Sequence, residues 1–188
     1  MAIVDLVVSN SEKTSLQRIS EITIQHPYSD IPYNIIKSSL AIFLNEMLYR
    51  SIKEQHADEG LYDFIKNSLL ILDLKTESCA NFHLLFLIQL SRFLGFYPQG
   101  NYSVRTPSFD LQEGRFIDQI PVHRNYLDPQ YSAVLDELIH TDYEKAHALR
   151  IDKQQRNFLL NSLIVFYQCH ISSFGDIRSL EILQEVIS

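Results

Sequence analysis

The segment Asn81–Phe96, NFHLLFLIQLSRFLGF, decides the fold of this chain. Read as a helix, it is apolar on nearly every side, and Arg92 is its only basic residue apart from a histidine. Helices of this kind lie at the centre of a bundle, with neighbours on several sides. Gly95 is suited to end the helix, and Pro98 prevents its continuation. The segment therefore predicts a helical bundle built around one central helix.

Amphipathic helices are expected on both sides of this segment, because apolar residues recur there with a period near 3.6. Residues His56–Gly60 are expected to separate the first two. In the longest late helix Phe158 falls on the inward stripe, and Ser179 is suited to cap the last helix. The expected ranges are Tyr33–Glu54, Leu61–Leu74, Pro129–Ile139, Tyr143–Leu149, Lys153–Ile171 and Leu180–Ile187.

The N-terminal residues have a different pattern. Ala2–Val8 is rich in β-branched residues, and Leu16–Ile24 roughly alternates apolar and polar residues across the polar stretch Ser9–Ser15. Two short strands in a hairpin are the natural interpretation. A lone hairpin is only marginally stable, so we expect it to lean on another part of the protein.

Helical periodicity is also lost in residues 97–128, where prolines and glycines accumulate. A small hairpin is expected around Glu113–Gly114. Irregular segments of this length inside compact domains are usually functional or mobile. The fold class is thus mainly α: a helical bundle preceded by a short β-hairpin and interrupted by an irregular segment.

Composition supports one folded domain. The chain has 188 residues, of which 46% are hydrophobic, and that content excludes a disordered chain. Neither an apolar run long enough to cross a membrane nor a signal peptide is present, so a soluble, cytoplasmic protein is expected. The net charge of −7 opposes DNA binding by the overall field, so any DNA contact needs a local basic patch.

Few residues suggest catalysis or metal binding. Cys79 and Cys169 lie far apart in apolar surroundings and are interpreted as buried free thiols. Two Glu-x-x-His pairs give a helical metalloenzyme as a minor hypothesis, although Thr141–Asp142 interrupts them and resembles a new helix start. No phosphate-binding glycine loop or nucleophile elbow is present. We therefore expect no enzymatic activity, no metal and no cofactor. The paired residues are Glu137, His140, Glu144 and His147.

Basic residues offer a binding hypothesis. If Arg92 is buried or half-buried in the central helix, it needs an acidic partner, and an internal salt bridge is the common solution. An apolar pocket rimmed by arginine would also suit a peptide that ends in an aromatic residue and a carboxylate. Aromatic residues between 97 and 126 could stack on bases, or they could close a small core. The basic residues nominated on this chemistry are Arg92, Arg105, Lys153 and Arg156; the aromatic residues are Tyr97, Tyr102, Phe109, Phe116 and Tyr126.

Four segments carry a resemblance. They are IPYNIIKSSLAIFLNEMLYRSI (Ile31–Ile52), NFHLLFLIQLSRFLGFYP (Asn81–Pro98), FDLQEGRF (Phe109–Phe116) and FGDIRSLEIL (Phe174–Leu183). Together they resemble the C-terminal helical domain of RecO, the bacterial recombination mediator, in the form of Bacteroides-like bacteria. The resemblance extends from Leu16 to the end of the chain, and LGFYP followed by FDLQEGRF is its most specific part.

The resemblance implies a function, partners and an association with the nucleoid. RecO proteins have an N-terminal OB-fold that binds DNA, followed by this non-enzymatic helical domain. They anneal complementary strands, bind the acidic C-terminal tail of the single-strand-binding protein, and load RecA together with RecR. On this basis residues 1–27 are expected to be the terminal strands of a truncated OB-fold, and residues 28–188 the RecO-like helical domain.

Two departures from the family pattern modify the expectation. The chain is shorter than a RecO protein by about an OB-fold's worth of residues, so we expect DNA binding by this chain to be weak and protein contacts to be more prominent. Some RecO proteins hold zinc with four cysteines after LGFYP, whereas residues 98–124 contain no cysteine here. The segment Phe109–Phe116 must then be held by apolar packing. The alternative that remains open is a helical interaction module with no role in nucleic-acid metabolism.

Overall fold

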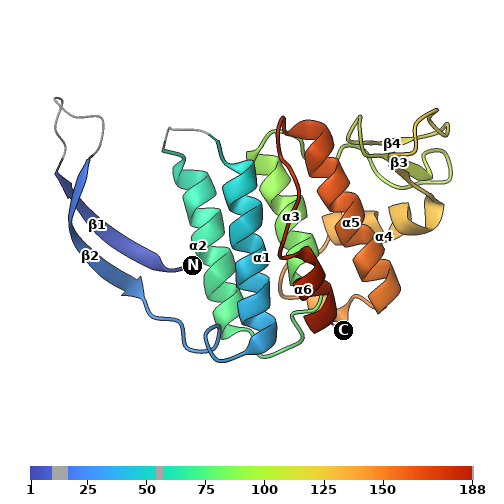
Figure 1. Cartoon of the computed structure of the whole chain (residues 1–188). Helices are drawn as coiled ribbons and strands as arrows, with labels where there is room; N and C mark the ends of the chain where they lie inside the picture. The colour runs from blue at the N-terminus through green and yellow to red at the C-terminus, as the bar shows by residue number, and fades with distance from the viewer. Residues whose placement is uncertain (10–16, 54–56, 188) are drawn as a thin grey trace.

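The structure, a computed structural model, describes residues 1–9, 17–53 and 57–187. In these ranges six α-helices form a bundle, from which an N-terminal hairpin projects on one side and a small sheet on the other (Figure 1). The mainly α fold is confirmed. The helices are α1 Ile35–Ser51, α2 Glu59–Leu74, α3 Phe82–Phe93, α4 Pro129–Ile139, α5 Lys153–His170 and α6 Leu180–Val186. The strands are β1 Ile3–Ser9, β2 Arg18–His26, β3 Ser108–Asp110, β4 Arg115–Ile117 and β5 Tyr126–Leu127.

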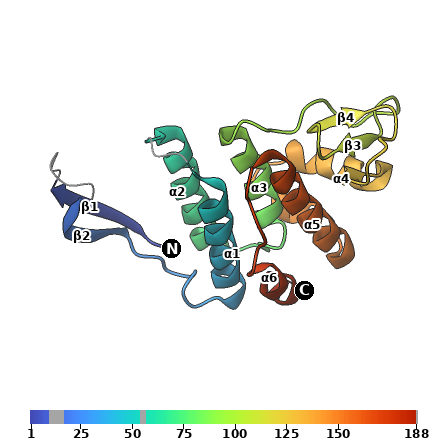
Figure 2. The ribbon, with the colours of Figure 1, turned by 45° about the horizontal axis from the view of Figure 1, so that its top comes forward.

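Helix α3 is the centre of the bundle, as predicted. Nine of its residues are buried, and it contacts α2, α4 and α5 (Figure 2). The hydroxyl of Tyr167, on α5, is buried and donates a hydrogen bond of 2.7 Å to the carbonyl of Leu87. Gly95 adopts φ +84° just after the helix, a conformation that favours glycine and confirms its role in ending the helix.

Three details of the helix prediction are wrong. Gly60 belongs to α2, because the Asp58 carboxylate accepts a hydrogen bond from the Leu61 N–H and starts the helix earlier; His56 lies outside the described residues. Only a 3₁₀ turn, Ala146–Ala148, forms where a helix from Tyr143 was expected. Phe158 is 41% exposed and stacks on Tyr131 of α4 instead of pointing inward.

The N-terminal hairpin is confirmed and has one apolar face. Directly opposed pairs Val4/Ile24, Leu6/Ile22 and Val8/Ile19 join β1 to β2. Five of these six side chains are exposed, and only the start of the hairpin, at Ile3, is buried. An apolar sheet face in water normally has a covering layer.

A buried carboxylate fixes the connection between hairpin and bundle. Asp73, near the end of α2, accepts hydrogen bonds of 2.8–2.9 Å from the backbone N–H groups of Ser29, Asp30 and Ile31 and from the Ser29 hydroxyl. Burial alone would raise the pKa of Asp73, but these hydrogen bonds outweigh it and lower the pKa to about 2. Lys37 is also buried and donates to the carbonyls of Asp73 and Lys75.

Residues 97–128, here called the loop module, contain a small sheet with strand order β4-β3-β5. The expected hairpin at Glu113–Gly114 is confirmed, because Asp110 pairs with Arg115 on its two sides. Phe109 and Phe116 are buried against each other, with ring centres 5.0 Å apart. Apolar packing therefore holds this segment, as predicted.

The two cysteines differ from each other in environment. Cys79 is buried as expected, and burial raises its pKa. Cys169 is free but exposed, so its interpretation as a buried thiol is wrong. Within the described ranges, no helix is both long and apolar enough to cross a bilayer.

Candidate nucleic-acid and peptide interface

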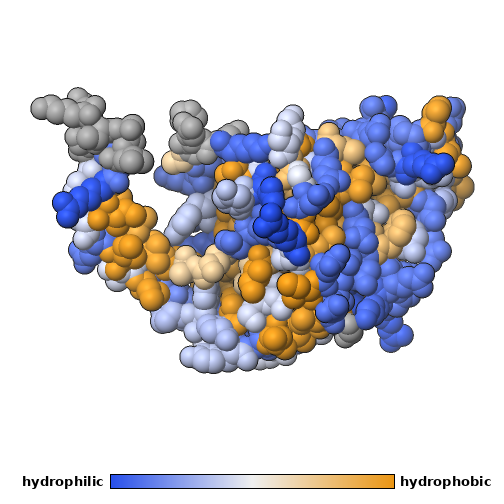
Figure 3. Space-filling view, in the orientation of Figure 1, coloured by the Kyte–Doolittle hydropathy of each residue, from blue (hydrophilic) through white to orange (hydrophobic). Residues whose placement is uncertain are grey.

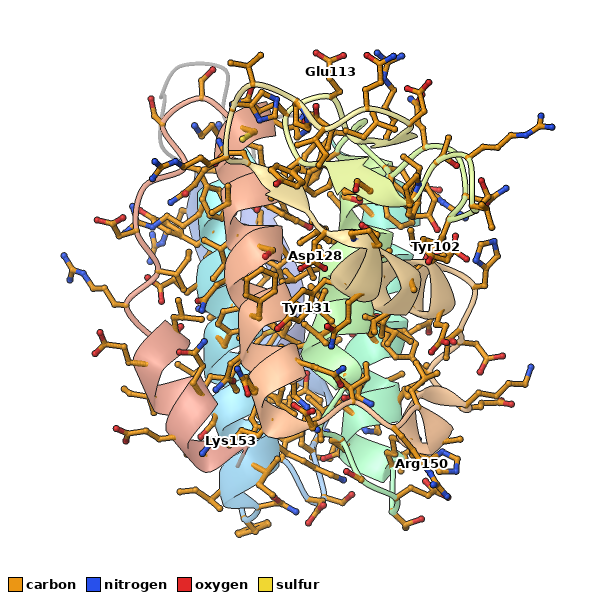
Figure 4. All side chains as sticks on the ribbon, turned by 90° about the vertical axis from the view of Figure 1, so that its right-hand side faces the viewer. Tyr102, Glu113, Asp128, Tyr131, Arg150 and Lys153 are labelled. Atoms are coloured by element: carbon orange, nitrogen blue, oxygen red, sulfur yellow. The ribbon has the colours of Figure 1, made fainter. Side chains whose placement is uncertain are left out.

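The nominated basic residues lie at two opposite ends of the bundle. Helices α3 and α5 run parallel: Arg156, in the first turn of α5, hydrogen-bonds Asn81 just before α3, whereas Phe96, just after α3, stacks on His170 at the end of α5. Arg92 therefore lies far from Lys153 and Arg156. Figure 4 shows Lys153 and Arg150 at the lower end and Glu113 of the loop module at the upper end. The structure does not bring the four nominated residues into one site.

Arg92 is exposed, so the condition under which it would need an acidic partner is not met. Its guanidinium carbon lies 4.5 Å from the centre of the Tyr97 ring, a cation–π contact. The turn at Gly95 brings Tyr97 back beside the end of α3. Stacking holds the guanidinium plane while its N–H groups can point toward a ligand.

Three further arginines are exposed in the loop module, the segment that follows α3 in the chain. The Arg115 backbone pairs with that of Gln99 in an isolated β-bridge. The Arg115 side chain is 60% exposed, and among the described residues its one ion pair is with the equally exposed Glu113 carboxylate at 3.6 Å. Such an exposed pair contributes little energy. Arg105 and Arg124 lie in exposed loops. We call Arg92, Arg105, Arg115 and Arg124 the loop-end arginines, because they lie at the end of α3 or in the loop module that follows it. Arg115 and Arg124 were not nominated from the sequence.

Contacts of a buried carboxylate stabilise the loop module. The Asp110 carboxylate is buried and accepts hydrogen bonds from the backbone N–H groups of Gln112 and Glu113. Its other oxygen lies 3.2 Å from His123 Nε2, which links two loops. Among the nominated aromatic residues, Phe109 and Phe116 are buried and cannot stack on bases, whereas Tyr102 is 38% exposed.

The opposite end contains a groove of about 420 Å³ at the start of α5, here called the α5 groove. Its apolar residues are Ala80, Leu149 and Ile151, and its basic residues are His147, Arg150 and Arg156. Lys153 lies in the first turn of α5, close to Asp152 and Gln155 of the lining. The groove combines small apolar surface with cationic side chains.

Arg156 is occupied within the protein. It donates hydrogen bonds to the Ile151 carbonyl at 2.8 Å, to Asn81 Oδ1 at 3.1 Å and to the Ile187 carbonyl at 3.2 Å. Partial burial lowers the pKa of Arg156, although arginine stays charged at neutral pH. Its first role is therefore to join the starts of α3 and α5 to the end of α6.

The residues of the metalloenzyme hypothesis do not form a metal site in the structure. Helix α4 ends at Ile139, and His140 caps its C-terminus, so one continuous helix does not carry the two pairs. Nowhere in the described ranges do three or more histidine, cysteine, aspartate or glutamate side chains converge in a way that could hold a metal ion.

Comparison with known proteins defines the class of protein. The family model for the recombination protein O C-terminal domain matches residues 32–181, which comprise α1 to α5, the loop module and the start of α6. The chain is 34% identical over 187 residues to a DNA repair protein RecO of Bacteroides fragilis, covering 99% of this chain and 77% of the relative. Identity to the RecO proteins of Azobacteroides pseudotrichonymphae and Flavobacterium psychrophilum is 32%, again over 77% of each relative.

The fold and the match thus define a RecO C-terminal helical domain preceded by a β-hairpin. The chain belongs to the RecO family of DNA repair proteins. No solved structure gives a significant match.

Proposed function

We propose that this protein is a non-enzymatic recombination mediator that supports annealing of single strands and loading of RecA. Family membership over the whole chain is the observation that carries the proposal. In this proposal the chain binds DNA, the single-strand-binding protein and RecR. Residues 1–27 act as the terminal strands of an OB-fold, which accounts for the uncovered apolar face of the hairpin.

The loop-end arginines are the proposed contact for single-stranded DNA. They are exposed, and Arg92 is stacked on Tyr97 in the arrangement that suits phosphate binding beside a base. A net charge of −7 surrounds them, so the interaction should be weak and strongly dependent on salt.

The experiment titrates fluorescent oligo(dT) with the protein at salt concentrations from about 20 to 200 mM. The binding constant at each concentration gives the dependence of affinity on salt, which reports counterion release. The variant Arg92→Gln/Arg115→Gln/Arg124→Gln should lower both the affinity and the salt slope, because each lost phosphate contact reduces the slope by about 1. The control Lys66→Gln changes a basic residue of α2 and should have no effect. Binding that is unaffected by the triple variant would refute this interface. No binding at all would favour the alternative, a helical interaction module without a nucleic-acid role.

The α5 groove is the proposed contact for the acidic tail of the single-strand-binding protein. Arg150 and Lys153 would attract the tail, Arg156 would contribute its positive charge, and Leu149 and Ile151 would contact its terminal phenylalanine. An acidic peptide ending in Phe should bind, and the same peptide with a C-terminal amide should bind at least about tenfold more weakly, since the amide removes the charge-assisted contact. Arg150→Glu/Lys153→Glu should abolish binding, whereas Arg105→Glu, at the other end, should not.

A further inference from the structure

Helix α1 exposes a line of apolar side chains that the fold does not use. Ile35, Ile42 and Tyr49 are 72%, 62% and 81% exposed. They follow one another at intervals of seven residues, which is nearly two helical turns, so they form one straight line on the outer side of α1. We call these three residues the α1 stripe. Figure 3 looks onto this side and shows apolar side chains over α1 and α6.

The stripe is separate from the core. The opposite side of α1 carries Leu40, Leu44 and Met47, which are completely buried in the bundle. Packing of α1 in the bundle therefore depends on that side, and the three apolar residues of the stripe do not contribute to the core. Residues spaced seven apart lie on one seam of a helix, the side on which two helices of a coiled coil meet.

Helix α6 extends the apolar surface. It runs antiparallel to α1, because Ser179 hydrogen-bonds Glu46 whereas Val186 and Ile36 line the same pocket at the other end. Ile182, between these points, is 60% exposed. It therefore lies level with the middle of the stripe along the helix axis.

The stripe is complementary to itself when two copies of α1 meet antiparallel. A two-fold axis through Ile42 places Ile42 against Ile42 of the partner subunit. The same axis places Ile35 against Tyr49 of the partner subunit, and Tyr49 against Ile35 of the partner subunit. All contacts along the line are then apolar.

The flanking residues also tolerate this arrangement. Ser38, Ser39 and Asn45 are small or uncharged and allow two helices to approach closely. Glu46 falls opposite Ser38 of the partner subunit, and its charge already caps α6. Arg50 falls opposite Asn34 of the partner subunit. No charge on α1 faces a like charge, so the seam carries no element that would exclude a second copy.

We propose that the α1 stripe is the contact between two copies of this chain in an antiparallel, two-fold symmetric dimer. The line from Ile35 to Tyr49 is about 21 Å long at 1.5 Å per residue. One helix pair of that length, even with Ile182, buries less than the roughly 800 Å² per partner of a standard stable interface. The dimer is therefore weak and forms with increasing concentration.

The experiment measures the molar mass of the chain by analytical ultracentrifugation over a range of concentrations. Two charge variants, Ile42→Glu and Ile42→Lys, each place like charges on the axis. Each alone should weaken association by at least about a hundredfold, since facing like charges cost several kcal/mol. A mixture of the two should associate again, because opposite charges then meet. Ile42 is largely exposed, and circular dichroism checks that both variants stay folded.

Two matched controls locate the contact. Ile120→Lys changes an equally exposed isoleucine of the loop module and should leave association unchanged. Leu6→Lys/Ile22→Lys disrupts the apolar face of the hairpin, the other surface by which two copies could associate. A monomer at every concentration would overturn the proposal. So would a dimer that survives both Ile42 variants, or one that only the hairpin variant dissociates.

Discussion

The carboxylate of Glu46, in the middle of α1, caps α6. It accepts hydrogen bonds from the Ser179 backbone N–H at 2.8 Å, from the Ser179 hydroxyl at 2.6 Å and from the Arg178 N–H at 3.0 Å. Ser179 occupies the predicted N-cap position, but its side chain makes no capping hydrogen bond. Helix α6 has seven residues and would not be stable alone, so α1 supplies the group that holds its beginning.

Replacing Glu46 by Ala should therefore destabilise the protein. Loss of a helix cap costs about 1 kcal/mol, with a range of roughly 0.5–2. Urea denaturation should show the lower free energy of unfolding. The control Glu137→Gln changes an exposed carboxylate of α4 and should lie within about 0.5 kcal/mol of wild type. Equal stabilities of the two variants would contradict the assignment of Glu46 as the cap.

His83 makes stability depend on pH. It is completely buried in α3, neither ring nitrogen has a hydrogen-bond partner among the described residues, and burial lowers its pKa to about 3. In the unfolded chain His83 binds a proton as the pH falls through about 6.5, whereas in the folded protein it stays neutral down to about pH 3. The free energy of unfolding therefore decreases as the pH drops from 6.5 toward 3. Between pH 7.5 and 5 this loss is about 2 kcal/mol.

The variant His83→Leu should remove that loss. At pH 7.5 its stability should equal or exceed that of wild type, because no unpaired polar nitrogen remains buried. Denaturation at pH 7.5 and pH 5 measures the difference for each protein. His140→Gln, an exposed histidine at the end of α4, should keep the pH dependence of wild type. If His83→Leu keeps it as well, another group is responsible.

Local patterns were sufficient to predict most of the fold. Three features depend only on neighbours in the sequence, and all three were predicted. They are the apolar residues on nearly every side of Phe82–Phe93, the turn at Gly95 and the start of α4 at Pro129. Tyr143 shows the limit. Its ring stacks on Phe82, at 4.7 Å between centres, and its carbonyl accepts a hydrogen bond from Lys75. These distant contacts replace the expected helix with a 3₁₀ turn.

The candidate interface was less predictable, because exposure and pairing depend on distant segments. Arg92 interrupts an apolar sequence, yet it lies at the helix end and stacks on Tyr97. Arg156 looks like a surface cation in sequence, but its three acceptors come from before α3, from before α5 and from the end of α6. Neither position could be inferred without the packing of α3 against α5.

Arg156→Gln should destabilise the bundle even without any ligand. The change removes charged hydrogen bonds to two buried or half-buried carbonyls, each worth about 1.5–3 kcal/mol before relaxation. Thermal unfolding should show the loss. The neighbouring Arg150→Gln removes a cation of the same groove that has no such bonds among the described contacts, so it should affect peptide binding but not stability. A fully stable Arg156→Gln variant would show that Arg156 is not a structural link.

Asp73→Asn tests the connection between hairpin and bundle. The amide can accept fewer hydrogen bonds from Ser29, Asp30 and Ile31, and it lacks the charge that favours them. The pKa of Asp73 is about 2 when folded, against 3.8 for the free side chain, so its ionised form stabilises the fold by about 2 kcal/mol above pH 4. This contribution is lost as the pH falls through 2.

We expect Asp73→Asn to lower the free energy of unfolding by a similar amount at pH 7 and to speed hydrogen exchange at residues 29–31. The control Asp63→Asn changes an exposed carboxylate of the same helix, α2. It should change neither the free energy of unfolding nor hydrogen exchange at residues 29–31. Unchanged exchange in Asp73→Asn would mean that the buried carboxylate does not fix the hairpin to the bundle.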